Sequence, residues 1–198
     1  MAKPFSFEIA KAAVLSMDLQ TAIVSAYTKG EPDLLTRAAS VLKTARHHGL
    51  SVLHVQVGFR PGLPEVSSRN QLFSAIKNSV QHQQMFQGPA GAIHPAVAPQ
   101  SEDIIITKHR ISAFAGTDLD VILRAKEIET LILFGIATSG VVLSTLLHAS
   151  DADYRLIVVK DCCTDADPEI HHCLVERVFP RLATVLNAAD LIDALGTD

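Results

Sequence analysis

The stretch TLILFGIATSGVVLSTLLHA, residues 130–149, predicts the fold of this chain. It begins with an apolar run at 131–134, which is typical of a strand buried on both faces. Two glycines then bracket a tight turn, in which Thr138 and Ser139 are residue types that often cap helices. From Val141 onward, apolar residues recur at helical spacing. A strand, a sharp turn and a helix are therefore predicted in succession.

The start of the helix in this stretch is a candidate reaction centre. Backbone N–H groups and the positive end of the helix dipole meet there, as in an oxyanion hole or beneath a nucleophile. The side chain predicted to point into this place is that of Val141, which has no reactive group. The chemistry is therefore expected to come from other residues.

The remaining sequence alternates between buried strands and amphipathic helices. Strands are predicted at 12–17, 51–57, 103–107, 131–134, 154–160 and 182–186. Helices are predicted at 33–48, 117–126, from 141 onward, 168–179 and 188–195, with a short one near 70–76. Alternation of this kind predicts an α/β fold with a parallel sheet covered by helices on both faces.

Residues 58 to about 100 interrupt this alternation, with Pro, Gly, Gln and Asn scattered throughout. A loop-rich insertion of this length inside a compact domain is usually functional. We expect it to form a lid, a substrate wall or an oligomer contact.

Composition limits the classes of function. The 198 residues, 48% apolar and 19% charged, predict one globular domain over 1–198. The net charge of −4 does not favour nucleic acid as a partner, and no apolar run is long enough to span a membrane. There is no signal-peptide pattern, and the three cysteines do not form a disulfide framework, which predicts a cytoplasmic protein.

Several polar residues lie at or just after the predicted carboxyl ends of strands, where open α/β sheets bind their ligands. They are Asp18, Gln56, Lys108, Thr138 and Asp161. Asp18 and Lys108 are the strongest pair, because a buried aspartate beside a lysine can give or take a proton. The alternative is a purely structural ion pair at the edge of the sheet.

Neither a metal nor a cofactor is predicted. The group Cys162, Cys163, His171, His172 and Cys173 does not match the usual zinc-ligand spacings. The 135–140 turn resembles neither a dinucleotide fingerprint nor a P-loop.

The motifs taken together resemble those of the isochorismatase-like hydrolases. The resemblance covers nearly the whole chain, and the matching segments are 17–20, 108–114, 117–119, 135–138, 161–163 and 167–171. It implies a three-layer α/β/α, Rossmann-like domain around a mostly parallel six-stranded sheet, assembled as a homo-dimer or homo-tetramer. It also implies a cis peptide bond at Ala137–Thr138.

Most members of that family use an Asp–Lys–Cys triad. By motif, Asp18 and Lys108 fill the first two places, and Val141 stands where the thiol is expected. A thioester intermediate is therefore not expected. The isochorismatases proper also lack this cysteine and resemble this chain in a glutamine at Gln56 and a K-x-R-x-S-A-F run.

The resemblance thus implies a cofactor-independent hydrolase of a small, carboxylate-bearing molecule, with vinyl-ether cleavage favoured. Asp18 would be the general acid or base, and Lys108 would tune it and bind an anionic group. The 137–140 turn and the Val141 N–H would supply oxyanion donors. The predicted substrate-binding residues are Gln20, Gln56, Phe114, Ala137, Thr138 and Val141.

Two alternatives remain open. In the first, the domain is not catalytic, and it binds a small ligand or serves as an assembly subunit. In the second, Ser139 acts as a surrogate nucleophile, although a serine at a helix start is more often a cap.

Overall fold

The computed structural model describes residues 7–28 and 33–196. Its strands are β1 (Ala12–Met17), β2 (Ser51–Val57), β3 (Ile104–Lys108), β4 (Thr130–Gly135), β5 (Arg155–Val159) and β6 (Thr184–Leu186). Its α-helices are α1 (Thr21–Tyr27), α2 (Leu34–His47), α3 (Gln71–Lys77), α4 (Val80–Gln84), α5 (Gly88–Gly91), α6 (Leu119–Ala125), α7 (Leu143–Asp151), α8 (Pro168–Cys173) and α9 (Ala188–Leu195).

The strands form one sheet in the order β3-β2-β1-β4-β5-β6, and every neighbouring pair is parallel. The chain starts in the middle of the sheet, extends it to β3, and then returns to add β4 on the other side of β1. The carboxyl ends of β1 and β4 therefore mark the topological switch point, where ligands bind in folds of this kind.

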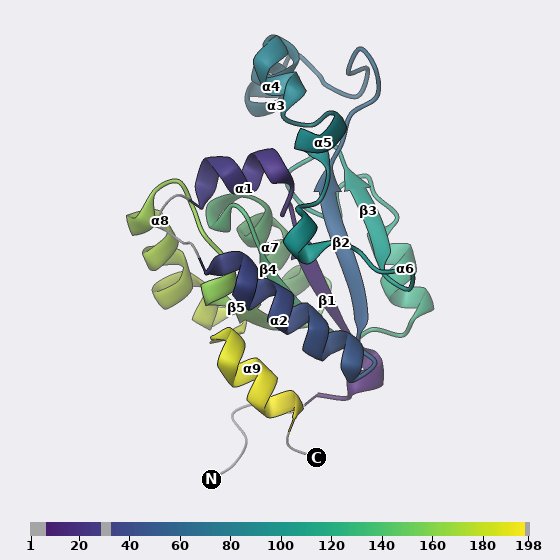
Figure 1. Cartoon of the computed structure of the whole chain (residues 1–198), viewed down its shortest axis with the longest axis vertical. Coiled ribbons are helices and arrows are strands. Elements are labelled where there is room, and N and C mark those ends of the chain that lie inside the picture. The colour runs from purple at the N-terminus through teal and green to yellow at the C-terminus, as the bar shows by residue number, and fades with distance from the viewer. Residues whose placement is uncertain (1–6, 29–32, 197–198) are drawn as a thin grey trace.

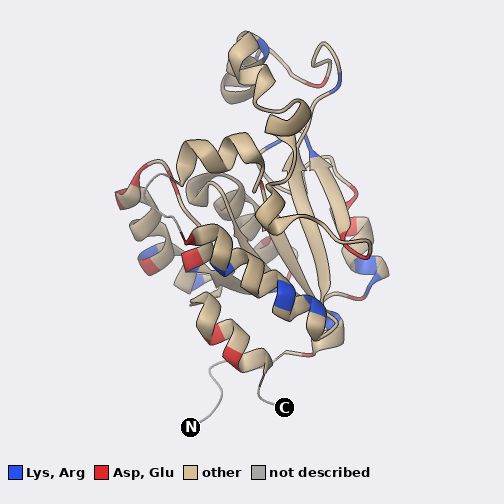
Figure 2. Ribbon diagram, in the orientation of Figure 1, with Lys and Arg blue, Asp and Glu red and all other residues tan. Residues whose placement is uncertain are grey.

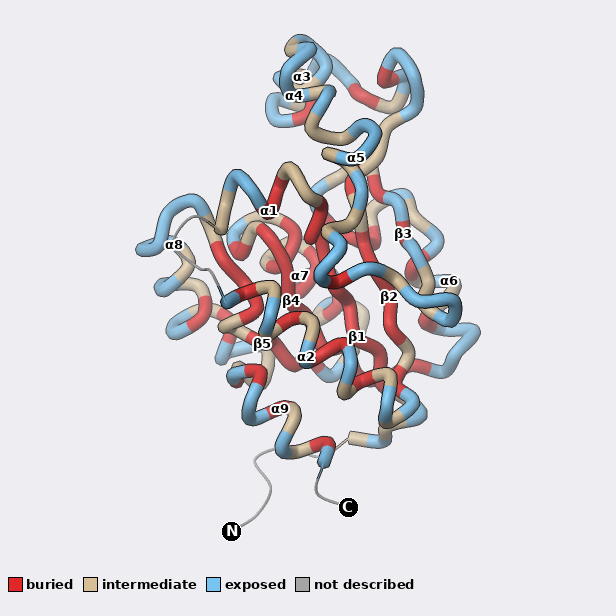
Figure 3. The backbone as a smooth tube through the Cα atoms, viewed as in Figure 1, coloured by how far each residue is buried: buried red, intermediate tan, exposed pale blue. Residues whose placement is uncertain are grey.

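Helices cover both faces of the sheet, as the sequence predicts. Figure 1 shows α2 and α9 on the near face and α6 and α7 behind the sheet. All six residues of β1 and all six of β4 are buried, because both strands lie in the middle of the sheet under two helical layers. The buried part of the backbone follows these strands and the inner sides of the helices (Figure 3).

The long connection between β2 and β3 stands beyond the carboxyl ends of the strands and carries α3, α4 and α5 (Figure 1). It has a small apolar cluster of its own, made by Leu63, Val66 and Phe73. Arg110 fastens it to the end of β3, since its Nη2 donates to the Glu65 carbonyl at 3.0 Å. This is the irregular region that the sequence predicts to be functional.

Charged side chains lie mainly on the helices and connections, whereas the strands carry few (Figure 2). Within the described ranges, we find no helix with the length and hydropathy that crossing a membrane requires.

The junction after β4 differs from its prediction. Thr138–Val142 forms a π-helical turn, and α7 begins only at Leu143. Gly140 has φ −96° and ψ −105° inside this turn, which interrupts the helix. Neither Thr138 nor Ser139 caps a helix, since the cap positions are Ala137 and Val142 and neither makes a side-chain cap bond.

Two further helices differ from the sequence prediction. The helix predicted over 168–179 is α-helical only as far as Cys173, and a π-helical and a 3₁₀ turn follow it. Helix α1, of seven residues, was not predicted.

The close approach of β1 and β4 at the switch point requires a glycine. Gly135 has φ +147°, and a Cβ there would lie 2.0 Å from the Met17 carbonyl oxygen. We expect Gly135→Ala to lower the free energy of unfolding by about 3 kcal/mol or more in urea denaturation.

Gly49→Ala is the matched control. Gly49 also has a positive φ, of +76°, but a Cβ at this position would meet no described atom within 4 Å. Backbone strain alone predicts a loss of about 1–2 kcal/mol there. Equal losses in the two variants would contradict the proposed contact.

Candidate active site

A pocket opens at the carboxyl ends of β1 and β4, at the switch point. Asp18 directly follows β1, Lys108 ends β3, and Ile136 and Ala137 directly follow β4. The other lining residues come from α1, the end of β2, the β2–β3 connection, the segment after β3 and the turn before α7. They are Ile23, Tyr27, Val57, Leu72, Phe73, Ile76, Met85, Phe86, Ile111, Gly140 and Val141.

Asp18 and Lys108 form a buried ion pair in this pocket. The Lys108 Nζ lies 2.9 Å from the Asp18 Oδ2, and the two side chains are only 3% and 7% exposed. Lys108 reaches past β2, and its Nζ also donates to the Arg110 carbonyl at 3.1 Å. Asp18 has φ +56°, a conformation that aspartate and asparagine tolerate better than most residues.

The second carboxylate oxygen of Asp18 takes no part in the ion pair. Its Oδ1 is buried and has no hydrogen-bond partner among the described residues. Burial raises the pKa of Asp18 above its ordinary value, while the positive charge of Lys108 and its hydrogen bond act in the opposite direction. Because burial is the larger cause, the protonated form persists to higher pH than in an exposed aspartate. The carboxyl group can thus donate a proton.

The turn after β4 forms one wall of the pocket. A cis peptide bond joins Ile136 to Ala137, one residue earlier than the predicted Ala137–Thr138 bond. Ala137 and Val141, two of the residues predicted to bind substrate, line the pocket. Ser139, the candidate surrogate nucleophile, is exposed and is not among the lining residues.

Three backbone donors of this turn already have acceptors within the protein. The Thr138 N–H donates to the Thr164 carbonyl at 2.9 Å, and the Ser139 N–H donates to the Asp165 carboxylate at 2.7 Å. The Gly140 N–H donates to the Ala137 carbonyl at 3.1 Å. This part of the predicted oxyanion hole is therefore already occupied by internal hydrogen bonds.

Gln20 and Gln56 lie outside the pocket lining, although both were predicted to bind substrate. The Gln20 amide accepts from the Val57 N–H at 2.7 Å and donates to the Val57 and Gly91 carbonyls, so it ties β2 to the insertion. The Gln56 amide donates to the Thr107 hydroxyl at 3.1 Å. The neighbouring Val57 lines the pocket instead.

Phe114 and Thr138 are likewise not among the lining residues. Phe114 stacks on His148 with ring centroids 4.5 Å apart. The Thr138 hydroxyl is fully buried and lies 2.8 Å from the His171 Nδ1. Both residues pack within the structure around the pocket and do not form part of its surface.

The insertion between β2 and β3 supplies a wall of the pocket whose residues were not predicted from the sequence. Phe73, Ile76, Met85 and Phe86 close the side of the pocket away from the sheet. The only sequence signal was the unusual length of the segment, since scattered apolar residues in an irregular region do not reveal which of them face a site.

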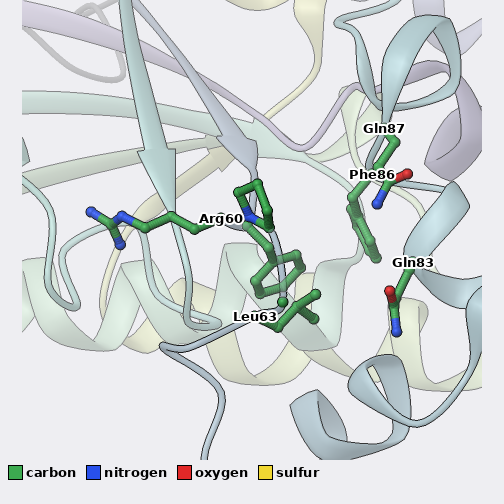
Figure 4. Close-up of a pocket in the computed structure, with 8 residues that line it drawn as sticks. Arg60, Leu63, Gln83, Phe86 and Gln87 are labelled. Atoms are coloured by element: carbon green, nitrogen blue, oxygen red, sulfur yellow. The ribbon is translucent and has the colours of Figure 1, made fainter.

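Phe86 also separates the pocket from a second, outer cavity. The inner pocket has a volume of ≈ 210 Å³. The outer cavity, of ≈ 350 Å³, lies between the 59–63 segment and the stretch that carries Gln83, Phe86 and Gln87 (Figure 4). Phe86 lines both and packs edge-on against Phe59, with ring centroids 5.5 Å apart.

The described residues that line the inner pocket include no cysteine. Cys162 and Cys163 are buried beyond β5, and burial raises the pKa of Cys163 to about 12. Cys173 is exposed at the end of α8. Within the described residues, no three His, Cys, Asp or Glu side chains are placed to hold a metal ion.

The fold and the site define a doubly wound α/β protein with a buried acid–base pair at its switch point. A model of the isochorismatase domain matches residues 12–190. The chain therefore belongs to the isochorismatase family, which includes hydrolases.

Individual relatives agree with this assignment. The chain is 31% identical over 186 residues to the ureidoacrylate amidohydrolase RutB of Azorhizobium caulinodans, covering 84% of this chain and 82% of the relative. It is 27% identical over 170 residues to the maleamate amidohydrolase of Pseudomonas putida, with coverages of 85% and 78%. The structure of an isochorismatase family protein from Burkholderia thailandensis matches with a TM-score of 0.79 at 29% identity, covering 95% of this chain and 97% of that one.

A double-mutant cycle tests the energetics of the buried pair. At a pH where Asp18 is still ionised, Lys108→Met leaves its carboxylate without a counter-charge, and we expect a loss of about 3–5 kcal/mol in the free energy of unfolding. Adding Asp18→Asn removes that charge and keeps a side chain suited to the positive φ, so the double variant should recover part of the loss. Urea denaturation measures both. A double variant less stable than Lys108→Met alone would contradict the coupling.

Proposed function

We propose that the chain hydrolyses a small molecule without a covalent intermediate, with Asp18 as the proton donor and Lys108 as its partner. The observation that carries the proposal is the buried Asp18 carboxyl group, which lines the pocket and has one oxygen without a hydrogen-bond partner among the described residues. A protonated carboxyl group held in an apolar site is a suitable general acid.

Cleavage of a vinyl ether is the reaction that this site suits best. Asp18 would transfer its proton to the terminal carbon of the carbon–carbon double bond, leaving an oxocarbenium ion. Water adds to the oxocarbenium carbon, and the resulting hemiacetal breaks down to an alcohol and a carbonyl compound. A proton released from the water restores Asp18, and Lys108 stabilises the carboxylate between these two transfers.

The names of two relatives specify amide hydrolysis. A cysteine-dependent amidase needs a thiolate within reach of the substrate. The described residues that line this pocket offer Val141 at the helix start and no thiol. For this reason we favour a route in which water is the only nucleophile.

A non-catalytic role is the second candidate, and the same lack of a thiol among the described lining residues favours it. In that case the domain binds a small ligand or serves as an assembly subunit. Stabilisation by a ligand in a thermal-shift screen, with no turnover of any tested vinyl ether or amide, would support this role over hydrolysis.

The first test is the loss of the acid. We expect Asp18→Asn to lower kcat/KM by ~10²–10⁴-fold towards small vinyl ethers, because the amide cannot donate a carboxyl proton. Product formation measures the effect. Asp120→Asn, a change in an ion-paired carboxylate that lies on α6 outside the pocket, is the control and should leave turnover unchanged. Undiminished turnover by Asp18→Asn would contradict the proposed role of Asp18 as the proton donor.

The pH profile gives a second test. Turnover requires protonated Asp18, so kcat/KM should be highest at low pH and fall as the pH rises through the pKa of Asp18, which burial raises. Lys108 holds this pKa down, so Lys108→Gln should move the falling limb to higher pH. A limb that stayed in place or moved to lower pH in this variant would reject Asp18 as the acid.

A further inference from the structure

The inner pocket contains few polar groups beyond the ion pair itself. Of its fifteen lining residues within the described ranges, only Asp18, Tyr27 and Lys108 have a side chain that carries oxygen or nitrogen. Aliphatic and aromatic side chains, a methionine, an alanine and a glycine make up the rest. Pockets of this composition bind ligands mainly through apolar contact and use one or two polar groups to orient them.

The one cation among the described lining residues already has partners within the protein. The Lys108 ammonium is paired with the Asp18 carboxylate at 2.9 Å and donates to the Arg110 carbonyl at 3.1 Å. The Arg110 guanidinium does not line the pocket. It donates to the carbonyls of His109 and Glu65, and it lies 5.9 Å from the centre of the Phe73 ring.

This balance of charge disfavours an anionic substrate. While Asp18 is ionised, the Asp18–Lys108 pair sums to zero, so a carboxylate entering the pocket would add an uncompensated negative charge among apolar groups. Burying such a charge costs several kcal/mol even after relaxation. The family resemblance implies a carboxylate on the substrate, whereas the lining of the pocket argues for a different class of substrate.

The volume limits the size of the ligand. An engineered apolar cavity of about 150 Å³ holds one benzene molecule. The inner pocket, at ≈ 210 Å³, has room for one ring with a short substituent. Phe86 lines both cavities, so a body that extended from the inner pocket into the outer cavity would have to displace it.

We propose that the site takes a small neutral substrate, with an apolar body of about one ring and its reacting group at Asp18. The proposal rests on the proposed function for the identity of the reacting group. An aryl or alkyl vinyl ether without a carboxylate is a substrate of this class.

Binding of inert analogues tests the proposal separately from turnover. Ethyl phenyl ether is a neutral analogue that lacks the double bond needed for hydrolysis, and 4-ethoxybenzoate is its carboxylate counterpart. In isothermal titration calorimetry at neutral pH, we expect the neutral ether to bind the wild-type chain at least tenfold more tightly. Equal or tighter binding of the carboxylate, or no binding of either compound, would overturn the proposal.

A charge introduced at the pocket mouth shows where the ligands bind. Leu72 lines the pocket and is 53% exposed, so Leu72→Arg places a guanidinium at the mouth without burying it. The variant should bind 4-ethoxybenzoate at least fivefold more tightly than the wild type does. Val121→Arg, at a 68% exposed position on α6 outside the lining, is the matched control and should leave both affinities unchanged. A gain in the control equal to that in Leu72→Arg would overturn the assignment to this pocket.

The binding and turnover results separate the two proposals. If ethyl phenyl ether binds as expected but phenyl vinyl ether is not hydrolysed, the proposed reaction fails and the ligand class stands. If phenyl vinyl ether is hydrolysed but the carboxylate analogue binds as well as the neutral one, the ligand class fails and the proposed reaction stands.

Discussion

The contact between Asp18 and Lys108 is the constraint on which the site depends. Two opposite charges lie almost fully buried at the carboxyl ends of parallel strands, with nitrogen and oxygen 2.9 Å apart. Such a pair contributes little net stability compared with apolar residues of the same volume, because both ions lose their hydration. Its value is therefore functional in our account, since burial and the neighbouring cation together set the protonation of one carboxyl group.

The surrounding structure keeps this pair almost fully buried at the base of the pocket. Gly135 allows β4 to approach β1 closely, which brings the turn that carries Ala137 and Val141 to the edge of the Asp18 pocket. The β2–β3 insertion closes the opposite side, and Phe86 divides the inner pocket from the outer cavity. An apolar enclosure of this kind strengthens the interactions of the few polar groups inside it.

Much of this arrangement was predictable because long apolar runs identify the strands, and parallel strands end at a common edge. The positions of Asp18 and Lys108 at the carboxyl ends of their strands followed from that rule. This rule does not predict to which face of the sheet a side chain points. Gln56 and Val57 are adjacent, so their side chains point to opposite faces, and it is the valine that lines the pocket. Tertiary partners decided the role of Phe114, which stacks on a residue far along the chain. A single sequence does not encode such pairings in any local pattern.

The proposed mechanism depends on the protonation of Asp18, which can be measured by NMR. Carboxyl ¹³C chemical shifts of the aspartates, followed against pH in the wild type and in Asp18→Asn, identify the Asp18 resonance by its loss in the variant. Our account predicts a midpoint above the ordinary aspartate value of 3.8, because burial is the largest influence on this carboxyl group. A midpoint at or below that value would mean that the ion pair dominates. Asp18 would then be a fixed carboxylate rather than the acid of the reaction.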